Sequence, residues 1–192
     1  MALVAVIGLA VIGSDDDAPP AVETESEAVR VLREFVTVAM AGEEGDGEDL
    51  VASPRVLEGT DQLSPLNFLR FVRRLSPELQ SVECVDIDAE TAACIVNYVD
   101  DWARAIVGES LTLWTARVEG GLITEFSGLV SNDDALTTAF FADYMPTAQP
   151  EAWDGCIGFE CLAGLPAQFA ADYAASEFFV PRTELTLPEA AG

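Results

Sequence analysis

Hydrophobic stretches rich in β-branched and aromatic residues, separated by short polar or glycine-containing turns in the middle of the chain, predict two β-hairpins. Residues 81–87 and 92–99 are rich in β-branched residues and flank a short polar turn, and such residues favour strands. Residues 111–118 and 122–129 are joined by a connection that contains Gly120 and Gly121, and glycine supplies the positive φ that a tight hairpin requires. The pattern therefore predicts four consecutive antiparallel strands.

Two helices are predicted before these strands. Apolar residues recur at helical spacing from Glu27 to about Ala41, and Ser26 is suited to cap this helix. A second helix is expected from Pro65 to Leu75, with Ser64 as its cap. The stretch between the two helices, residues 50–59, is expected to form a short turn and strand.

The chain after the strands is less regular and predicts a helical extension. A helix is expected over residues 133–144, where Met145-Pro146 would end it. Residues 149–164 are expected to form a loop, because Pro, Gly and Cys punctuate them. A last amphipathic helix is expected from Ala167 to Phe179.

The first thirteen residues form an apolar run that has the length of a signal-peptide core. Residues 14–25 follow as an acidic, proline-containing segment, which we expect to be a solvated linker. The run lacks a basic flank, and Ser14 stands where a bacterial lipoprotein signal carries its lipidated Cys, so one interpretation is a true start further upstream. The alternative is a buried N-terminal strand or helix. Export is favoured, which predicts a secreted or cell-envelope protein.

Composition predicts one main domain and excludes some partners. The 192 residues are 50% hydrophobic, which is enough for one core, so we expect an α+β domain over residues 26–131 and a cysteine-containing extension over 132–192. The net charge is -25, from 34 acidic residues against nine basic ones, and every basic residue is Arg. This charge disfavours nucleic acid and anionic membranes. The one dense basic group, on the second predicted helix, is interpreted as offsetting the acidic surface, with binding of an anionic ligand as the alternative: Arg70, Arg73 and Arg74.

The absence of histidine limits the chemistry. It excludes Ser-His-Asp and Cys-His nucleophilic catalysis and His-ligated zinc. The acidic loop over residues 43–49 does not follow the spacing of a calcium loop, so a solvated loop is favoured there. We therefore expect neither a metal site nor a cofactor.

Four cysteines allow three disulfide pairings. Cys84 and Cys94 are equally distant from Ala89, so a hairpin centred there places them opposite each other on adjacent strands. Cys156 and Cys161 would then close a small loop, and both bonds fit an oxidising compartment. Two alternatives remain: buried free thiols on the sheet, and a four-thiolate metal site, although neither pair has Cys-x-x-Cys spacing.

The order of two helices and four strands, ending in the segment from Trp114 to Phe126, resembles the nuclear transport factor two-like superfamily. That superfamily includes polyketide-cyclase-like proteins, ketosteroid isomerases and limonene epoxide hydrolases, and the resemblance covers about residues 27–130. It implies a cone: a curved antiparallel sheet packed on the N-terminal helices, with an apolar pocket at its wide end.

The resemblance also suggests where a site would lie. Ketosteroid isomerase-like sites use Asp and Tyr, and epoxide hydrolase-like sites use an Asp, Arg, Asp set. Ser127 stands where the latter carry an acid, so that catalytic set does not transfer to this chain. Eight residues remain as candidates: Tyr98, Asp100, Asp101, Trp102, Arg104, Trp114, Arg117 and Glu125. Of these, the predicted pocket residues are Tyr98, Asp100, Trp114 and Arg117. Strand alternation places Tyr98 and Asp100 on one face and points Trp114 and Arg117 to opposite faces. The connection from Asp100 to Arg104 could form a site of paired carboxylates with an Arg, but an ordinary solvated connection is favoured there.

These observations predict an exported, non-catalytic domain that binds a small apolar ligand or a protein partner through its pocket or its sheet. A homodimer formed through the sheet is one possible assembly. The alternative is a histidine-independent acid-base enzyme, isomerase or epoxide hydrolase-like, acting on a hydrophobic small molecule. A third hypothesis is a structural module of the cell envelope. A buried carboxylate beside Tyr98 or Arg117 in an open cavity would favour the enzyme, whereas an interior filled by Phe, Leu and Trp would favour the others.

Overall fold

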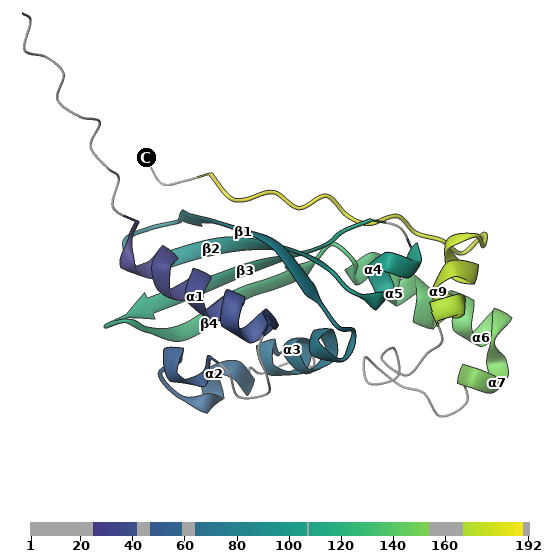
Figure 1. The fold of residues 1–192 in the computed structure, drawn as a ribbon, viewed down its shortest axis with the longest axis horizontal. Coiled ribbons are helices and arrows are strands. Elements are labelled where there is room, and N and C mark those ends of the chain that lie inside the picture. The colour runs from purple at the N-terminus through teal and green to yellow at the C-terminus, as the bar shows by residue number, and fades with distance from the viewer. Residues whose placement is uncertain (1–24, 42–46, 59–63, 107, 154–166, 190–192) are drawn as a thin grey trace, which may run out of the picture.

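Four antiparallel strands form one curved, open sheet in the order β1-β2-β3-β4, and helices pack against it in an α+β fold (Figure 1). This computed structural model describes residues 25–41, 47–58, 64–106, 108–153 and 167–189. The strands are β1 (Glu78–Asp86), β2 (Thr91–Val99), β3 (Ser110–Glu119) and β4 (Leu122–Ser131). They confirm the predicted pair of hairpins, each a few residues longer than expected.

The helices lie in two groups, one against the sheet and one beyond its end (Figure 1). The first group comprises α1 (Glu27–Ala41), the 3-10 turn η1 (Glu48–Leu50), α2 (Pro54–Glu58) and α3 (Pro65–Arg74). The second comprises α4 (Asp101–Ile106), α5 (Asp134–Ala139), the π-helical turn η2 (Phe140–Tyr144), α6 (Met145–Ala148), α7 (Pro150–Trp153) and α9 (Ala167–Ala174).

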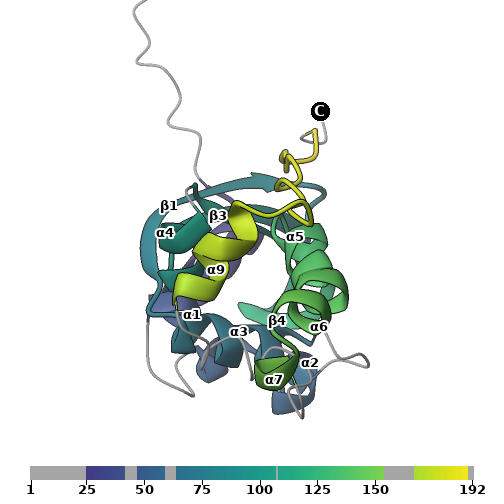
Figure 2. The same cartoon turned by 90° about the vertical axis from the view of Figure 1, so that its right-hand side faces the viewer.

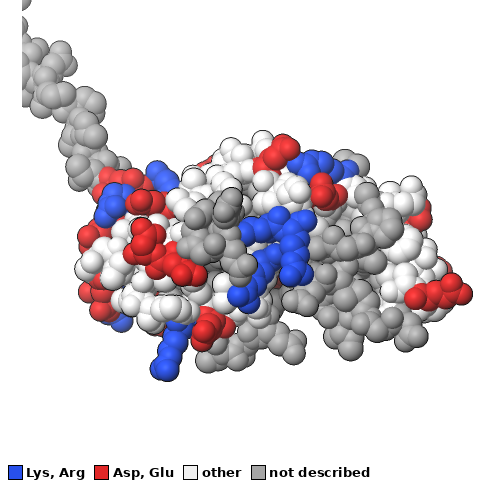
Figure 3. All heavy atoms as spheres, turned by 60° about the horizontal axis from the view of Figure 1, so that its bottom comes forward, with Lys and Arg blue, Asp and Glu red and all other residues white. Residues whose placement is uncertain are grey.

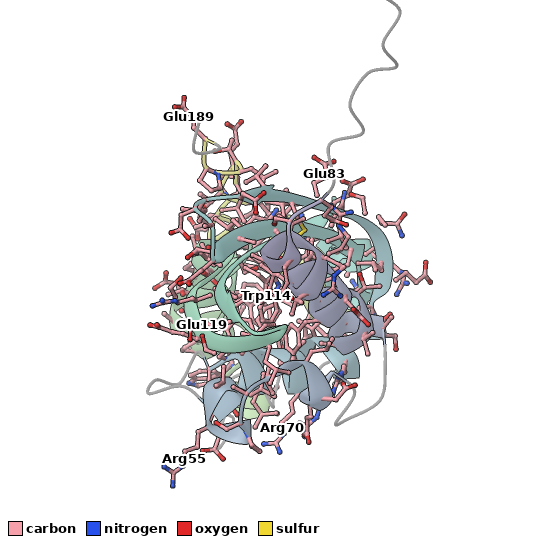
Figure 4. The ribbon with its side chains drawn as sticks, turned by 90° about the vertical axis from the view of Figure 1, so that its left-hand side faces the viewer. Arg55, Arg70, Glu83, Trp114, Glu119 and Glu189 are labelled. Atoms are coloured by element: carbon pink, nitrogen blue, oxygen red, sulfur yellow. A yellow bond between two sulfur atoms is a disulfide. The ribbon has the colours of Figure 1, made fainter. Side chains whose placement is uncertain are left out.

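Helix α1 begins where the sequence predicted. The Ser26 hydroxyl accepts a hydrogen bond from the Val29 amide at 3.0 Å, which satisfies one of the free amides of the first turn. The apolar face of α1 lies in the concave side of the sheet, where Figure 4 shows the helix enclosed by the strands. The apolar residues that recur at helical spacing are all buried: Val29, Leu32, Phe35, Val36 and Met40.

Helix α3 also has the predicted start and supports the end of α1. The Ser64 hydroxyl accepts from the Asn67 amide at 3.2 Å, and Pro65 occupies the first turn. In the last turn of α3, the Arg73 Nε donates to the Ala39 carbonyl oxygen at 2.8 Å. This contact places a positive charge at the negative end of α1, whose own last turn contains no basic residue.

Both hairpin turns follow from their residues. Gly120 and Gly121 have φ angles of 60° and 79°, a left-handed conformation that side chains disfavour. In the first hairpin, Cys84 lies directly opposite Cys94 and the two form a disulfide, so the predicted pairing is confirmed. The second predicted disulfide, Cys156 with Cys161, lies outside the described residues.

The first hydrophobic core fills the concave side of the sheet. Trp114 on β3 is fully buried, and its indole is surrounded by the rings of Phe35, Phe68 and Phe126 at centroid distances of 6.0, 5.7 and 5.7 Å. These rings come from α1, α3 and β4, so one side chain joins three elements. The curvature of the sheet is thus matched by bulky aromatic residues inside it.

A second core lies beyond the end of the sheet, which Figure 2 views directly. Phe140 is fully buried there and packs edge-on against Trp102 of α4 at 4.8 Å and against Tyr173 of α9 at 5.3 Å. Tyr144 stacks on Phe140 at 5.5 Å. This core therefore joins the helix between β2 and β3 to the helices that follow the sheet.

Two expectations about the connections were wrong. Residues 50–59 were expected to contain a strand, but Pro54 opens helix α2, and only Val51 forms an isolated bridge, to Ile123. Proline at the first helical position has no amide to lose, which favours a helix there. The connection after β2, expected to be an ordinary solvated one, contains helix α4 with Trp102 and Ile106 buried.

The boundaries of the C-terminal helices also differ from the prediction. Met145-Pro146 was expected to end a helix, but Pro146 lies in the first turn of α6, where a missing amide is harmless. The last helix was expected to reach Phe179 but ends at Ala174. Ser176 causes this end, because its hydroxyl donates to the Tyr173 carbonyl and accepts from the Phe178 amide.

Basic side chains gather in the middle of the face that α2 and α3 form, amid acidic ones (Figure 3). Arg55 and Arg70 are exposed on this side and point away from the sheet in Figure 4. Among the described residues, no helix is both long and apolar enough to cross a membrane.

Candidate functional site

The four predicted pocket residues do not converge on one site. Tyr98 and Asp100 lie together at the end of β2, and both are buried. Trp114 lies in the first core, whereas Arg117 is exposed near the far end of β3. The sequence had predicted that Trp114 and Arg117 point to opposite faces of the sheet, and the burial of the two side chains confirms this.

Trp114 is a core residue with a satisfied polar atom. Its indole Nε1 donates to the Thr112 Oγ1 at 3.0 Å, and its ring is enclosed by the aromatic residues of the first core. Figure 4 shows the side chain pointing into the concave side, toward α1. A ligand that stacked on this indole would have to displace those rings.

Arg117 forms exposed ion pairs at the tip of the second hairpin. Its guanidinium contacts the Glu90 carboxylate through Nη2 at 2.5 Å and the Glu119 carboxylate through Nε at 2.9 Å. All three side chains are about half exposed, so the pairs contribute little to the free energy of folding. Arg117 therefore belongs to the charged rim of the sheet.

Tyr98 and Asp100 instead belong to a buried polar cluster that joins the sheet to the C-terminal part of the chain. The cluster lies where β2 ends, β3 begins and α5 begins, between the two hydrophobic cores. Its five members are Tyr98, Asp100, Ser110, Asp133 and Arg182.

Asp133 is at the centre of the buried polar cluster. Its Oδ2 accepts from the Ser110 hydroxyl at 2.6 Å, and its Oδ1 accepts from Arg182 Nε at 2.6 Å. The Asp133 and Arg182 side chains are only 11% and 15% exposed, so this ion pair is shielded from water. Gly108 makes room for it, because a Cβ there would lie 2.7 Å from Arg182 Nη1.

Asp100 contributes a second carboxyl group to the same region. Its Oδ1 accepts from the Ala103 amide at 2.6 Å and caps α4. Burial raises the pKa of Asp100 to about 6, the Ala103 amide opposes the rise, the Asp133 carboxylate adds to it and Arg182 opposes it. The Asp100 carboxyl is thus held close to its point of ionisation near neutral pH.

Tyr98 completes the buried polar cluster on the sheet side. Burial raises its pKa well above the ordinary value, and the charge of Asp100 adds to this effect. Ser110, which lies opposite Tyr98 in the pairing of β2 with β3, shares a hydrogen bond with the tyrosine side chain. The phenol is therefore protonated at any physiological pH and serves as a neutral hydrogen-bonding group.

The other four candidates lie in separate surroundings. Trp102 packs in the second core, and Glu125 is exposed on β4. Arg104 contacts the Glu78 carboxylate at 2.7 Å and the Asp101 carboxylate at 2.8 Å. Among the described residues, no group of three or more acidic or cysteine side chains is arranged to hold a metal ion.

Sequence reasoning missed three members of the buried polar cluster: Ser110, Asp133 and Arg182. They are distant in sequence from Tyr98 and Asp100, and no motif links them. One signal was present, because Arg182 is the only basic residue after Arg117 in a strongly acidic chain. An isolated base of this kind suggests a specific acidic partner.

A second candidate surface lies on the convex side of the sheet. Ile95, Leu113 and Val130 are direct neighbours across β2, β3 and β4, so they form one row on one face. This convex row points away from the core, since Trp114 and the other inward residues occupy the alternate positions. Val130 is 44% exposed, a high value for a large apolar side chain.

Comparisons of the chain with protein families, with curated proteins and with solved structures found no match.

Replacing Asp100 by Asn tests the titration of the cluster. The folded-state pKa of Asp100 is raised from 3.8 to about 6, so its contribution to stability is fully present below pH 3.8 and is lost as pH rises through about 6. Asn keeps the cap of α4 without the charge. We expect D100N to gain about 2–3 kcal/mol in unfolding free energy relative to the unmodified chain between pH 4 and pH 7.5.

Urea unfolding of both chains across this pH range measures the difference. D101N is the matched control, because Asp101 is the exposed neighbour of Asp100. A pH-independent difference between D100N and the unmodified chain would contradict the titration.

Proposed function

We propose that this protein is an extracytoplasmic, non-catalytic binding domain that engages a protein partner through the convex face of its sheet. The observation that carries the proposal is the convex row, Ile95, Leu113 and Val130, on a chain of net charge -25. In a chain this rich in acidic residues, charged side chains could occupy the outward positions of the sheet. An apolar row with an exposed valine at these positions therefore favours a contact surface.

The neighbours of the convex row support the same proposal. On β3 the adjacent outward positions are Leu111 and Thr115, both partly exposed and uncharged. Charged residues flank the row, because the exposed Glu83 lies opposite Ile95 on β1 and Arg117 lies toward the tip of the hairpin. An apolar centre with a charged edge is typical of protein interfaces.

The interior of the sheet favours a protein partner over a small apolar ligand. Large side chains of the first core, among them Trp114, Phe35 and Leu32, are fully buried on the concave side. A ligand would have to replace contacts that these residues already make with one another. Binding on the convex face displaces none of these core side chains.

The buried polar cluster does not support the enzyme hypothesis. Asp100 has a pKa suited to proton transfer, but it is 2% exposed and its Oδ1 is engaged by the Ala103 amide. Tyr98 is equally buried, and Arg117 lies at the far end of β3. We interpret the cluster as a structural joint between the sheet and the C-terminal segment.

Two further features of the molecule accord with the proposed location and architecture. The disulfide between Cys84 and Cys94 is compatible with an oxidising compartment outside the cytoplasm. The curved, open sheet around α1 is compatible with the cone of the nuclear transport factor two-like superfamily, and we propose that architecture on the order of its elements.

The test compares two valine substitutions of similar exposure. V130R places a charge in the convex row, whereas V38R places it on α1, where Val38 is 37% exposed. Tagged chains are exported by the native host and recovered with their bound proteins. We expect V38R to retain the partner at the level of the unmodified chain and V130R to lose at least about tenfold, because a buried unpaired charge is strongly unfavourable.

Equal recovery of the partner with all three chains would overturn the proposal. Circular dichroism of both variants tests whether each retains its fold. Native mass spectrometry of the purified chain tests the small-ligand alternative. An apolar molecule that stays bound in the V130R variant would show that the ligand binds in the interior.

A further inference from the structure

The C-terminal segment, residues 183–189, lies extended along the side of the sheet that faces away from α1. Figure 1 shows it running back from α9 over the length of the strands, and Figure 4 shows it beyond the sheet as seen from the helix. It therefore lies on the same side of the sheet as the convex row. No regular secondary structure is formed within it.

This segment is anchored at its start. Arg182 forms the buried ion pair with Asp133, and the Thr183 amide donates to the Asn132 carbonyl oxygen at 2.9 Å. Just upstream, the Val180 amide donates to the Tyr173 hydroxyl at 3.2 Å. These contacts fix where the chain reaches the sheet and the direction in which it continues.

Beyond the anchor, the segment alternates in burial. Leu185 and Leu187 are half-buried, whereas Glu184 and Thr186 between and before them are exposed. In an extended chain, alternate side chains point to opposite sides. The two leucines therefore face the protein and the polar residues face the solvent.

We infer that the convex face is a docking surface for an extended peptide segment with leucines at alternate positions. The chain's own residues 183–189 occupy this face and compete with the partner for it. The inference rests on the proposed function and names the chemistry of the partner. The chain itself supplies the pattern, because Leu185 and Leu187 are half-buried two residues apart in a segment that runs along this side of the sheet.

The strength of the competition follows from tethering. A segment held by Arg182 competes at a local concentration on the order of millimolar, so a short peptide of the same sequence cannot displace it readily. Removing the two leucines weakens the tethered competitor while the anchor at Arg182 and Thr183 stays in place. A peptide in solution then finds the surface open.

The experiment uses the full chain and its L185S/L187S variant. The probe is a synthetic peptide of residues 183–189, Thr-Glu-Leu-Thr-Leu-Pro-Glu, titrated while the methyl NMR signals of Ile95, Leu113 and Val130 are followed. We expect the peptide to bind L185S/L187S at least about tenfold more tightly than it binds the unmodified chain. A peptide that carries both serine substitutions is expected to bind at least about tenfold more weakly than the leucine peptide.

Adding V130R to L185S/L187S is expected to abolish peptide binding, and adding V38R is expected to leave it unchanged. Equal binding of both peptides, equal binding to both chains, or shifts confined to other methyl groups would overturn the inference. Concentration-dependent dimerisation of the unmodified chain that V130R abolishes, without peptide binding, would assign the face to a second copy and would also overturn it.

The two proposals fail separately. Loss of the partner with V130R, together with no peptide binding, would overturn the competing-segment inference and support the proposed function. Peptide binding together with undiminished recovery of the partner from V130R would overturn the proposed function and support the docking of residues 183–189 on the convex face.

Discussion

Replacing Arg182 by Met is expected to lower the free energy of unfolding by about 3–5 kcal/mol, because it leaves the buried Asp133 carboxylate without its cation. Asp133 would keep only the Ser110 hydroxyl among the partners of its carboxylate described above. Methionine preserves most of the aliphatic length, so the loss reports chiefly on charge. Urea unfolding at pH 7 followed by circular dichroism measures it.

The matched control is R117M, in which the ion pairs removed are about half exposed. It is expected to lose less than about 1 kcal/mol. The double variant R182M/D133N removes both charges of the buried pair and is expected to recover part of the loss. Similar losses for R182M and R117M would contradict the account of the buried polar cluster.

Replacing Trp114 by Ala is expected to lower the free energy of unfolding by about 3–5 kcal/mol through the cavity that it leaves. The indole is fully buried and joins rings from α1, α3 and β4. The measurement is again urea unfolding, followed by circular dichroism because tryptophan fluorescence would change.

Trp153 provides the matched control for this substitution. It is half-buried on α7 and packs on Phe141 at 5.8 Å, so W153A is expected to lose clearly less than W114A. If Trp114 were instead a platform for a ligand, W114A would leave an open pocket at small loss of stability. A loss for W114A no larger than that for W153A would therefore support the small-ligand alternative.

The sheet was predictable from the sequence because its signals are local. Each signal depends on a few neighbouring residues: the short stretches of β-branched and aromatic residues, the Gly120-Gly121 turn, and the equal distances of Cys84 and Cys94 from Ala89. The caps Ser26 and Ser64 likewise act within one helical turn. These features required no knowledge of tertiary contacts.

The short helices were less predictable. In α4 the residues Asp101–Ile106 carry a charged, mixed pattern, and what fixes them is the buried Asp100 cap and the packing of Trp102 on Phe140. Both contacts depend on the fold. A window of six residues is too short for helical periodicity to be decisive.

The candidate site was predicted only in part, for the same reason. Tyr98 and Asp100 were found because strand alternation places both on the same face at the end of the predicted strand. Asp133 and Arg182 join them only after the chain has passed through the C-terminal helices and returned to the sheet. Their distance in sequence leaves no spacing from which the contact can be inferred.

The convex row illustrates a further limit. Alternation identifies Ile95, Leu113 and Val130 as sharing one face once the register is known, but both faces of this sheet contain apolar residues. Which face is inside is decided by the large residues opposite α1, above all Trp114. The exposed face could then be recognised only from the structure.

The central claim is that the convex face contacts the partner, and site-specific photocrosslinking tests it most directly. A benzophenone amino acid is placed at position 130 in one chain and at position 38 in another, and the complexes are irradiated and mapped by mass spectrometry. The account predicts crosslinks to the partner from position 130 and none from position 38. Complexes that form normally but crosslink only from position 38, on α1, would contradict it.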